Sequence, residues 1–219
     1  MDEKIKAFCS WSGGKESVLS FYRAKMAGIH IVCLLNMISE DGKYSCSHGV
    51  GSKLLRLQAE AMEVPIVQRN TTWETYEEEF KKVISGFKER EIRTGVFGDI
   101  DIQEHRDWVE RICGEISLKA IVPLWKVERE KLIEEFIDLG FRAIIVATQA
   151  DLLGKEWLGR EIDERLVEEI KATGNIDLCG EKGEYHTFVY DGPIFKKPVE
   201  FMMGRKRLKD RHWFLELLF

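Results

Sequence analysis

The residues with the clearest chemical potential lie near the N-terminus, in the stretch CSWSGGKES at positions 9–17. This stretch follows a short apolar segment and precedes a helical pattern. Free backbone N–H groups, the positive end of a helix dipole and the Lys15 ammonium would therefore gather in one place. Gly13 and Gly14 let the main chain approach a ligand closely, and the serines add hydroxyl donors. We predict an anion site here, best suited to phosphate.

This stretch is not a Walker A loop, because Glu16 stands where Ser or Thr would follow Gly-Lys, and it is not a GxGxxG fingerprint. It resembles the SGGKDS motif of the PP-loop ATP pyrophosphatases, which hold ATP by its β and γ phosphates and cleave between α and β. Glu16 replaces the usual Asp of that family. An ordinary strand–turn–helix with a glycine-rich turn remains the alternative. The resemblance implies nucleotide contacts from Ser10, Trp11, Ser12, Gly13, Gly14, Lys15, Glu16 and Ser17.

A carboxylate follows a second apolar segment in Gly98-Asp99-Ile100. At the carboxyl end of a neighbouring strand, Asp99 would hold Mg²⁺ against phosphates, since Mg²⁺ prefers one or two carboxylates together with phosphate oxygens. The alternative is that Asp99 only caps the helix that follows. Arg106 would offer a guanidinium to the same cleft, although a solvated helix face is the commoner place for such a residue. His48, in a polar segment, is a further candidate for nucleotide binding.

The second half contains the dense polar segment CGEKGEYHTFV at positions 179–189. Two carboxylates, a phenol, an imidazole and a hydroxyl surround two glycines just before an apolar strand. Such a concentration of hydrogen-bonding groups needs water or a ligand to satisfy it. A surface turn would explain part of this pattern, but it explains the Tyr-His-Thr that follows less readily. The candidate substrate contacts are Glu181, Gly183, Glu184, Tyr185, His186 and Thr187.

The elements that must position these groups alternate between strand and helix over the first half. Five strands with helices between them predict a doubly wound, Rossmann-like parallel sheet, an α/β fold. Ligands in such folds bind beyond the carboxyl ends of the strands, where the 12–17 loop and Asp99 both emerge. The expected strands are 5–10, 30–38, 64–68, 95–100 and 120–124, and the expected helices are 15–27, 50–62, 74–91 and 103–116.

The rest of the chain has a different pattern, which predicts a second, smaller α+β domain. Helices are expected at 128–139 and 159–173, and strands at 142–148, 185–190, 199–203 and 213–217. We place the boundary near Pro123–Lys126. The first domain, 1–124, would bind ATP, and the second, 125–219, would bind the substrate.

Composition narrows the function classes. A net charge of −5 over 219 residues argues against a protein whose main partner is nucleic acid. The five cysteines form neither a CxxC pair nor a metal-spaced cluster, so we expect free thiols in a reducing cytoplasm. The N-terminal residues do not resemble a signal peptide, and no apolar run approaches membrane-spanning length. We therefore expect a cytoplasmic, globular protein without a membrane partner, and a homo-oligomer stays open.

Several motifs together are similar to the diphthine–ammonia ligase family, in its short archaeal form. They span almost the whole chain in the order of the family, and the GExGEYHT segment is far more selective than the PP-loop. Lys182 stands where Asn or Gly is expected inside that segment. The matching pieces are Ser12–Ser17, Gly98–Ile100, Pro123–Trp125, Leu158–Arg160, Gly180–Phe188 and Asp191–Pro193.

This resemblance implies amidation of diphthine, a modified histidine of translation elongation factor 2, to diphthamide. ATP and Mg²⁺ would be used, and AMP and pyrophosphate would be released. Lys15 and the loop would stabilise the leaving pyrophosphate, with a metal near Asp99. Glu184 or His186 would take a proton from ammonium so that ammonia can attack. Glu181, Tyr185, Trp125 or Trp11 would face the trimethylammonium group of diphthine.

Two other classes stay open on sequence grounds. One is a PP-loop enzyme that modifies tRNA, against which the acidic net charge and the lack of a CxxC pair speak. The other is an adenine-nucleotide sensor without catalysis, against which the carboxylate-rich second motif and the intact Lys15 speak. Turnover of ATP in the presence of substrate distinguishes the sensor from an enzyme.

Overall fold

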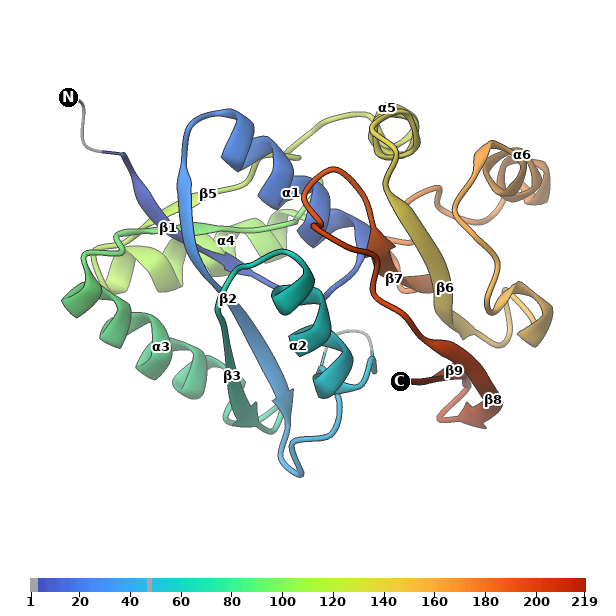
Figure 1. The fold of residues 1–219 in the computed structure, drawn as a ribbon, viewed down its shortest axis with the longest axis horizontal. Coiled ribbons are helices and arrows are strands. Elements are labelled where there is room, and N and C mark those ends of the chain that lie inside the picture. The colour runs from blue at the N-terminus through green and yellow to red at the C-terminus, as the bar shows by residue number, and fades with distance from the viewer. Residues whose placement is uncertain (1–3, 47–48) are drawn as a thin grey trace.

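The computed structural model describes residues 4–46 and 49–219. Two β-sheets lie next to each other, each with its own helices (Figure 1). The first sheet contains five parallel strands in the order β3-β2-β1-β4-β5, which confirms the predicted doubly wound α/β fold. Its strands are β1 (Lys6–Ser10), β2 (His30–Ser39), β3 (Ile66–Thr71), β4 (Thr94–Val96) and β5 (Lys119–Ile121).

Helices cover both faces of this sheet because its central strands are apolar on both sides. The face carrying Phe8, Cys33 and Leu35 packs against two helices that contribute Phe80 and Ile112. The opposite face, which carries Ala7 and Cys9, packs against the other two helices. The four helices are α1 (Lys15–Met26), α2 (Ser52–Ala61), α3 (Tyr76–Phe87) and α4 (Gln103–Glu115), and the short 3₁₀ turn η1 (Lys88–Arg90) follows α3.

The second sheet contains four antiparallel strands in the order β7-β6-β9-β8, as expected for a smaller α+β unit. Its residues continue the hydrophobic core on the α1 and α2 side of the first sheet, so the two sheets share one core. The elements are α5 (Arg129–Asp138), β6 (Arg142–Gln149), the 3₁₀ turn η2 (Lys155–Trp157), α6 (Glu164–Thr173), β7 (Tyr185–Asp191), β8 (Met202–Lys209) and β9 (His212–Leu218).

Several expected boundaries were wrong, and three of them affect the cleft or the second part of the chain. The helix expected from position 159 begins at Glu164, because Asp163 caps it by accepting a hydrogen bond from Leu166 N at 2.7 Å. Strand β4 ends at Val96, which leaves Gly98 and Asp99 in the loop that follows. The strand expected at 199–203 instead runs over Met202–Lys209, a mostly basic segment whose strand structure comes from pairing with β9 and not from an apolar pattern.

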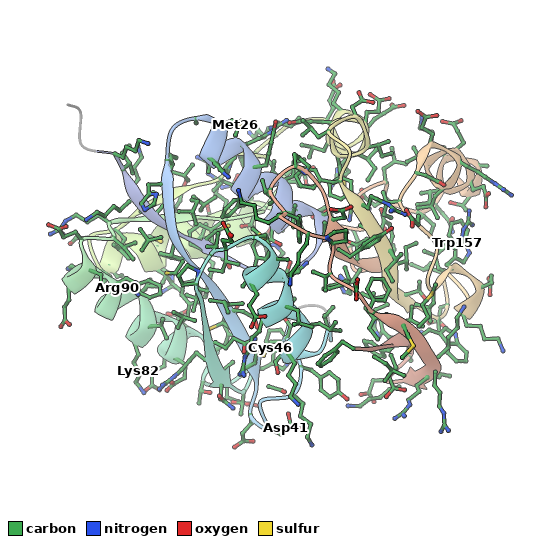
Figure 2. The ribbon with its side chains drawn as sticks, in the orientation of Figure 1. Met26, Asp41, Cys46, Lys82, Arg90 and Trp157 are labelled. Atoms are coloured by element: carbon green, nitrogen blue, oxygen red, sulfur yellow. The ribbon has the colours of Figure 1, made fainter. Side chains whose placement is uncertain are left out.

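Charged side chains lie on the exposed surface of the helices that cover the first sheet. Figure 2 labels Lys82 and Arg90 there and Trp157 at the other end of the molecule. None of the helices in the described part of the chain is long and apolar enough to cross a membrane.

Candidate active site

A cleft of about 340 Å³ opens where the two parts of the chain meet. One wall is the loop between β1 and α1, together with the loop that contains Gly98 and Asp99. The other wall is the segment from Cys179 to Thr187. The structure therefore brings together the two polar motifs that are most distant in the sequence.

The β1–α1 loop has the geometry of an anion cradle. Gly13 takes a left-handed backbone conformation with φ of +79°, and a Cβ there would lie 2.3 Å from Leu55 Cδ2. Gly14 is the N-cap of α1 and has no side-chain capping bond, and of the first turn the N–H of Lys15 is bonded to Thr187, which leaves those of Glu16 and Ser17 for an anion. Ser12 Oγ accepts from Gly14 N at 3.3 Å and donates to Ser17 Oγ at 3.2 Å, which shapes the loop.

Lys15 is buried, with 4% of its surface exposed. Its Nζ donates to the Cys179 carbonyl at 2.6 Å and pairs with Glu16 at 2.7 Å. The ammonium also lies 4.6 Å from the centre of the Tyr185 ring. Burial lowers the pKa of Lys15, but the Glu16 carboxylate and the Tyr185 phenol raise it, and the net pKa lies above its ordinary value. Lys15 thus holds a fixed positive charge between the two walls.

Strand β7 is attached directly to this loop. Thr187 Oγ1 accepts from Lys15 N at 3.1 Å, and Val189 N donates to the Gly13 carbonyl at 3.0 Å. Gln58, on α2 and with none of its surface exposed, joins the same contact. Its Nε2 donates to the Gly13 carbonyl at 2.9 Å and to the Val189 carbonyl at 2.5 Å, and its Oε1 accepts from Trp11 Nε1 at 3.0 Å. The loop and β7 are therefore held together by buried hydrogen bonds.

The loop before β7 is held by the buried carboxylate of Glu184 and the partly buried carboxylate of Asp177. Glu184, 3% exposed, accepts from Asp177 N at 3.1 Å and from Lys182 N at 3.0 Å. Asp177 accepts from Cys179 N at 2.8 Å and pairs with Arg129 Nε at 2.7 Å. Glu184 is not among the residues that line the cleft. Its position suits organisation of the loop better than contact with a substrate.

We expect Glu184→Ala to lower the free energy of unfolding by about 2 kcal/mol, because two backbone N–H groups lose a charged acceptor. Glu184→Gln, which keeps one acceptor oxygen, should lose less. Thermal denaturation of both variants measures the difference. A fall in turnover of Glu184→Gln with unchanged stability would instead support the predicted role of Glu184 as a base.

The titratable groups of the second wall differ in charge state. Burial raises the pKa of Glu181 to about 7, and repulsion from Glu16 and Asp99 contributes, while Lys15 opposes the shift. Burial lowers the pKa of His186 to about 4, with Lys15 and His212 acting in the same direction, so the imidazole is neutral at pH 7. Burial also raises the pKa of Tyr185, whose hydroxyl donates to the Leu178 carbonyl. Glu181 is thus the group of this wall that titrates near neutrality.

Three carboxylates, those of Glu16, Asp99 and Glu181, converge on the cleft. Asp99 lies 3.4 Å from His105 Nδ1, and this contact raises the pKa of His105. Asp99 does not cap α4, whose N-cap is Ile102. Among the described residues no three ligating side chains are close enough to hold a metal unaided. The carboxylates nevertheless fit a Mg²⁺ ion that arrives with phosphates, because such an ion needs only one or two protein ligands.

The remaining predicted residues lie in different places. Ser10, Trp11, Gly98 and Gly183 line the cleft. Arg106 pairs with Glu110 at 2.6 Å and covers the Trp125 ring at 4.7 Å, and neither Arg106 nor Trp125 lines the cleft. His48 lies outside the described residues.

Sequence reasoning missed the apolar side of the cleft and the central role of Gln58. The one signal in the sequence that marks Gln58 is that it is a polar residue on the mostly apolar face of α2. The apolar side carries no such signal, because its residues belong to the ordinary apolar patterns of β2, of the start of α3 and of the segment after β4. They are Leu35, Met37, Tyr76 and Phe97.

Comparison with known proteins identifies two matching family models. The diphthamide synthase N-terminal domain matches residues 5–120, and the diphthamide synthase C-terminal domain matches residues 128–217. A diphthine–ammonia ligase of Rattus norvegicus is 31% identical over 213 residues, which cover 86% of this chain and 79% of that protein. The diphthine–ammonia ligase of Schizosaccharomyces pombe is 28% identical over 212 residues, which cover 86% of this chain but 34% of that longer protein.

Among solved structures, the crystal structure of a predicted subunit of tRNA methyltransferase from Methanocaldococcus jannaschii is similar. The match has a TM-score of 0.46 and 16% sequence identity, and it covers 89% of this chain and 100% of that chain.

Proposed function

The chain belongs to the diphthamide synthase family, and from this we propose that it is an ATP-dependent ligase that amidates diphthine on translation elongation factor 2. The observation that carries the proposal is that the PP-loop and the Gly180–Thr187 segment line one cleft. A phosphate site and an acceptor site must adjoin for a carboxylate to be activated by ATP. A cytoplasmic location accords with this substrate and with the five free cysteines.

We assign the nucleotide to the 1–124 part and the diphthine side chain to the 125–219 part. The triphosphate would contact the N–H groups at the start of α1 and the Lys15 ammonium, and the adenine would pack against Met37 and Phe97. Asp99 and Glu16 would hold Mg²⁺, which when bound supplies positive charge to the phosphates. The negative potential of the three carboxylates suits the trimethylammonium group of diphthine. The aromatic faces of Trp11, Tyr185 and Trp125 are already in contact with protein groups.

The reaction would proceed in two steps. A carboxylate oxygen of diphthine attacks the α-phosphorus of ATP, and the bond to the bridging oxygen breaks to release pyrophosphate. Lys15 and the helix terminus stabilise the negative charge that develops on this leaving group. Ammonia then attacks the carbonyl carbon of the acyl-adenylate, and AMP leaves to give the amide.

Ammonium must lose a proton before it attacks, and we propose Glu181 as the base. Its carboxyl lines the cleft, and burial raises its pKa to about 7, which suits a base that acts near neutral pH. Glu184 is engaged by two backbone N–H groups, and the lowered pKa of His186 makes it a weaker base. His186 remains suited to accept a hydrogen bond from the substrate.

We expect the rate of amidation in the wild type, measured at constant ammonium concentration, to rise with pH up to about 7 and to level off above it, because Glu181 must be ionised to accept a proton from ammonium. Glu181→Gln should lose this dependence and should lower kcat by about a hundredfold.

The raised pKa of Glu181 also means that ionisation of this carboxyl destabilises the fold, so the stability that the group contributes is lost as pH rises from about 4.5 through about 7. Glu181→Gln should therefore melt no lower than wild type at pH 8, which separates catalysis from folding.

The proposed function is tested with purified protein, diphthine-bearing elongation factor 2, ATP, Mg²⁺ and ammonium. Mass spectrometry should record a loss of about one mass unit on the modified histidine, with AMP and pyrophosphate as nucleotide products. Bound ATP without any change in the factor would contradict the ligase and would favour the nucleotide sensor.

A further inference from the structure

A second hollow of about 510 Å³ lies on the far side of the second sheet from β7. We define the β8 groove as this hollow, which is bounded by β8 and β9 on one side and by Tyr44 and residues 49–51 of the connection from β2 to α2 on the other. The two sides adjoin closely, since a Cβ on Gly49 would lie 2.9 Å from the Phe214 ring. Figure 1 shows the β8–β9 hairpin beside the lower end of α2.

The β8 groove has a charge opposite to that of the whole molecule. Arg205, Arg207 and Lys209 line it, with Glu216 as the acidic residue among its lining. The chain as a whole has a net charge of −5. Arg207 and Glu216 are 3.6 Å apart and their side chains are 64% and 39% exposed, so this pair is weak and leaves the Arg207 charge available. The groove therefore attracts a negatively charged ligand.

The same groove contains apolar surface. Phe214 and Leu218 on β9 and Tyr44 on the facing connection line it, and Tyr44 is 53% and Leu218 44% exposed. Basic residues on an edge strand also prevent strands of different molecules from pairing. That role requires no apolar groups beside the charges, whereas recognition of a peptide requires both.

The pairing of the strands places the groove near the cleft. His186 pairs with Ala147, Ala147 with Phe214, and Phe214 with Arg207. Neighbouring strands are separated by about 4.8 Å, so the backbones of His186 and Arg207 are about 14 Å apart. A few residues of extended chain span this distance, so a protein whose modified side chain enters the cleft can reach the groove with a nearby segment.

We propose that the β8 groove docks an acidic segment of the protein substrate that also carries an apolar side chain. This inference rests on the proposed function, because it takes the occupant to be part of the protein that bears diphthine. An RNA backbone fits less well, since the described residues that line the groove supply three cations beside a carboxylate and are mostly apolar. The strand β8 is an edge of its sheet, so its backbone is also placed to pair with an extended segment.

The test uses two double variants with equal change of charge. Arg205→Ser with Lys209→Ser removes two cations from the groove, and Lys196→Ser with Lys197→Ser removes two exposed cations outside it. We expect the groove variant to raise the KM for diphthine-bearing elongation factor 2 about tenfold and to reduce its dependence on salt. Its kcat and its KM for ATP should stay as in the wild type, and the control variant should match the wild type throughout.

Binding of fluorescently labelled elongation factor 2 that lacks diphthine separates the two proposals. The groove inference expects about tenfold weaker binding of this unmodified factor by the groove variant than by the wild type and the control. Equal binding by all three proteins would overturn it, even if amidation proceeds. Amidation failing in the wild type while this difference persists would overturn the proposed function and leave the groove in place. If the groove variant loses only its binding to a labelled single-stranded RNA, the groove belongs to RNA and the inference is overturned. If the groove variant instead changes its oligomeric state, the groove belongs to a second copy of the chain and the inference is likewise overturned.

Discussion

Lys15→Met should lower the rate of AMP and pyrophosphate formation by about a thousandfold, the largest effect that we expect from a single substitution. The Lys15 ammonium lies between Glu16 and the Cys179 carbonyl, at the start of α1. In the proposed reaction it faces the pyrophosphate as charge develops on it. Among the described residues that line the cleft, Lys15 is the only Lys or Arg, and the two histidines there are His105, whose pKa is raised by Asp99, and His186, which is neutral at pH 7. Quantifying AMP and amide together in a single-turnover experiment measures the loss.

Lys182→Met is the matched control for this experiment. Lys182 is an exposed residue of the loop before β7, and its side chain does not line the cleft. We expect its substitution to leave the rate within about twofold of the wild type. Retention of the wild-type rate by Lys15→Met would show that the phosphates bind elsewhere, and would contradict both the PP-loop assignment and the proposed mechanism.

Gln58→Leu should lower the free energy of unfolding by about 3 kcal/mol and the melting temperature by about 6 to 12 °C. The substitution removes three buried hydrogen bonds and leaves Trp11 Nε1 and the Val189 carbonyl without these partners. Because the loop at Gly13 would lose its attachment to α2, we also expect the KM for ATP to rise about tenfold. Calorimetry and initial rates measure the two effects separately.

Gln103→Leu provides the control, since Gln103 lies at the exposed start of α4 and donates a surface hydrogen bond to Asp107 at 2.7 Å. Its melting temperature should stay within about 2 °C of the wild type. A Gln58→Leu protein with lowered stability but an unchanged KM for ATP would mean that Gln58 supports the fold without positioning the loop. Gln58→Glu sharpens the result, because it keeps an acceptor for Trp11 and loses the donors to the two carbonyls.

The strands and helices of the first half follow from local patterns. Continuous apolar runs such as 31–35 identify parallel strands that are buried on both faces, and glycine after a helical stripe ends the helix. The predicted ends of strands and helices were less accurate where contacts between distant segments decide them. Strand β8 is the example: its sequence MMGRKRLK has no clean alternation, and its extended form depends on β9 and on the left-handed turn at Asp210 and Arg211.

For the candidate site, the sequence identified which stretches of the chain take part, but it did not identify the role of each residue in them. The 9–17 and 179–189 stretches were both identified from their composition, and the structure brings them into one cleft. Burial then distinguishes two neighbouring carboxylates that look alike in the sequence. Glu184 is engaged by backbone N–H groups, whereas the Glu181 carboxyl faces the cleft with a raised pKa.

The sequence by itself determined the doubly wound fold and the family and predicted a candidate anion-binding loop, because these depend on short patterns of residues close together in the chain. Only the tertiary structure decided how the loop is held, since Gln58, Thr187 and Val189 reach it from distant segments. The charge states of Lys15, Glu181 and His186 were likewise decided by folding, because burial and neighbouring charges set a pKa. Both depend on distances in space that separation along the chain does not specify.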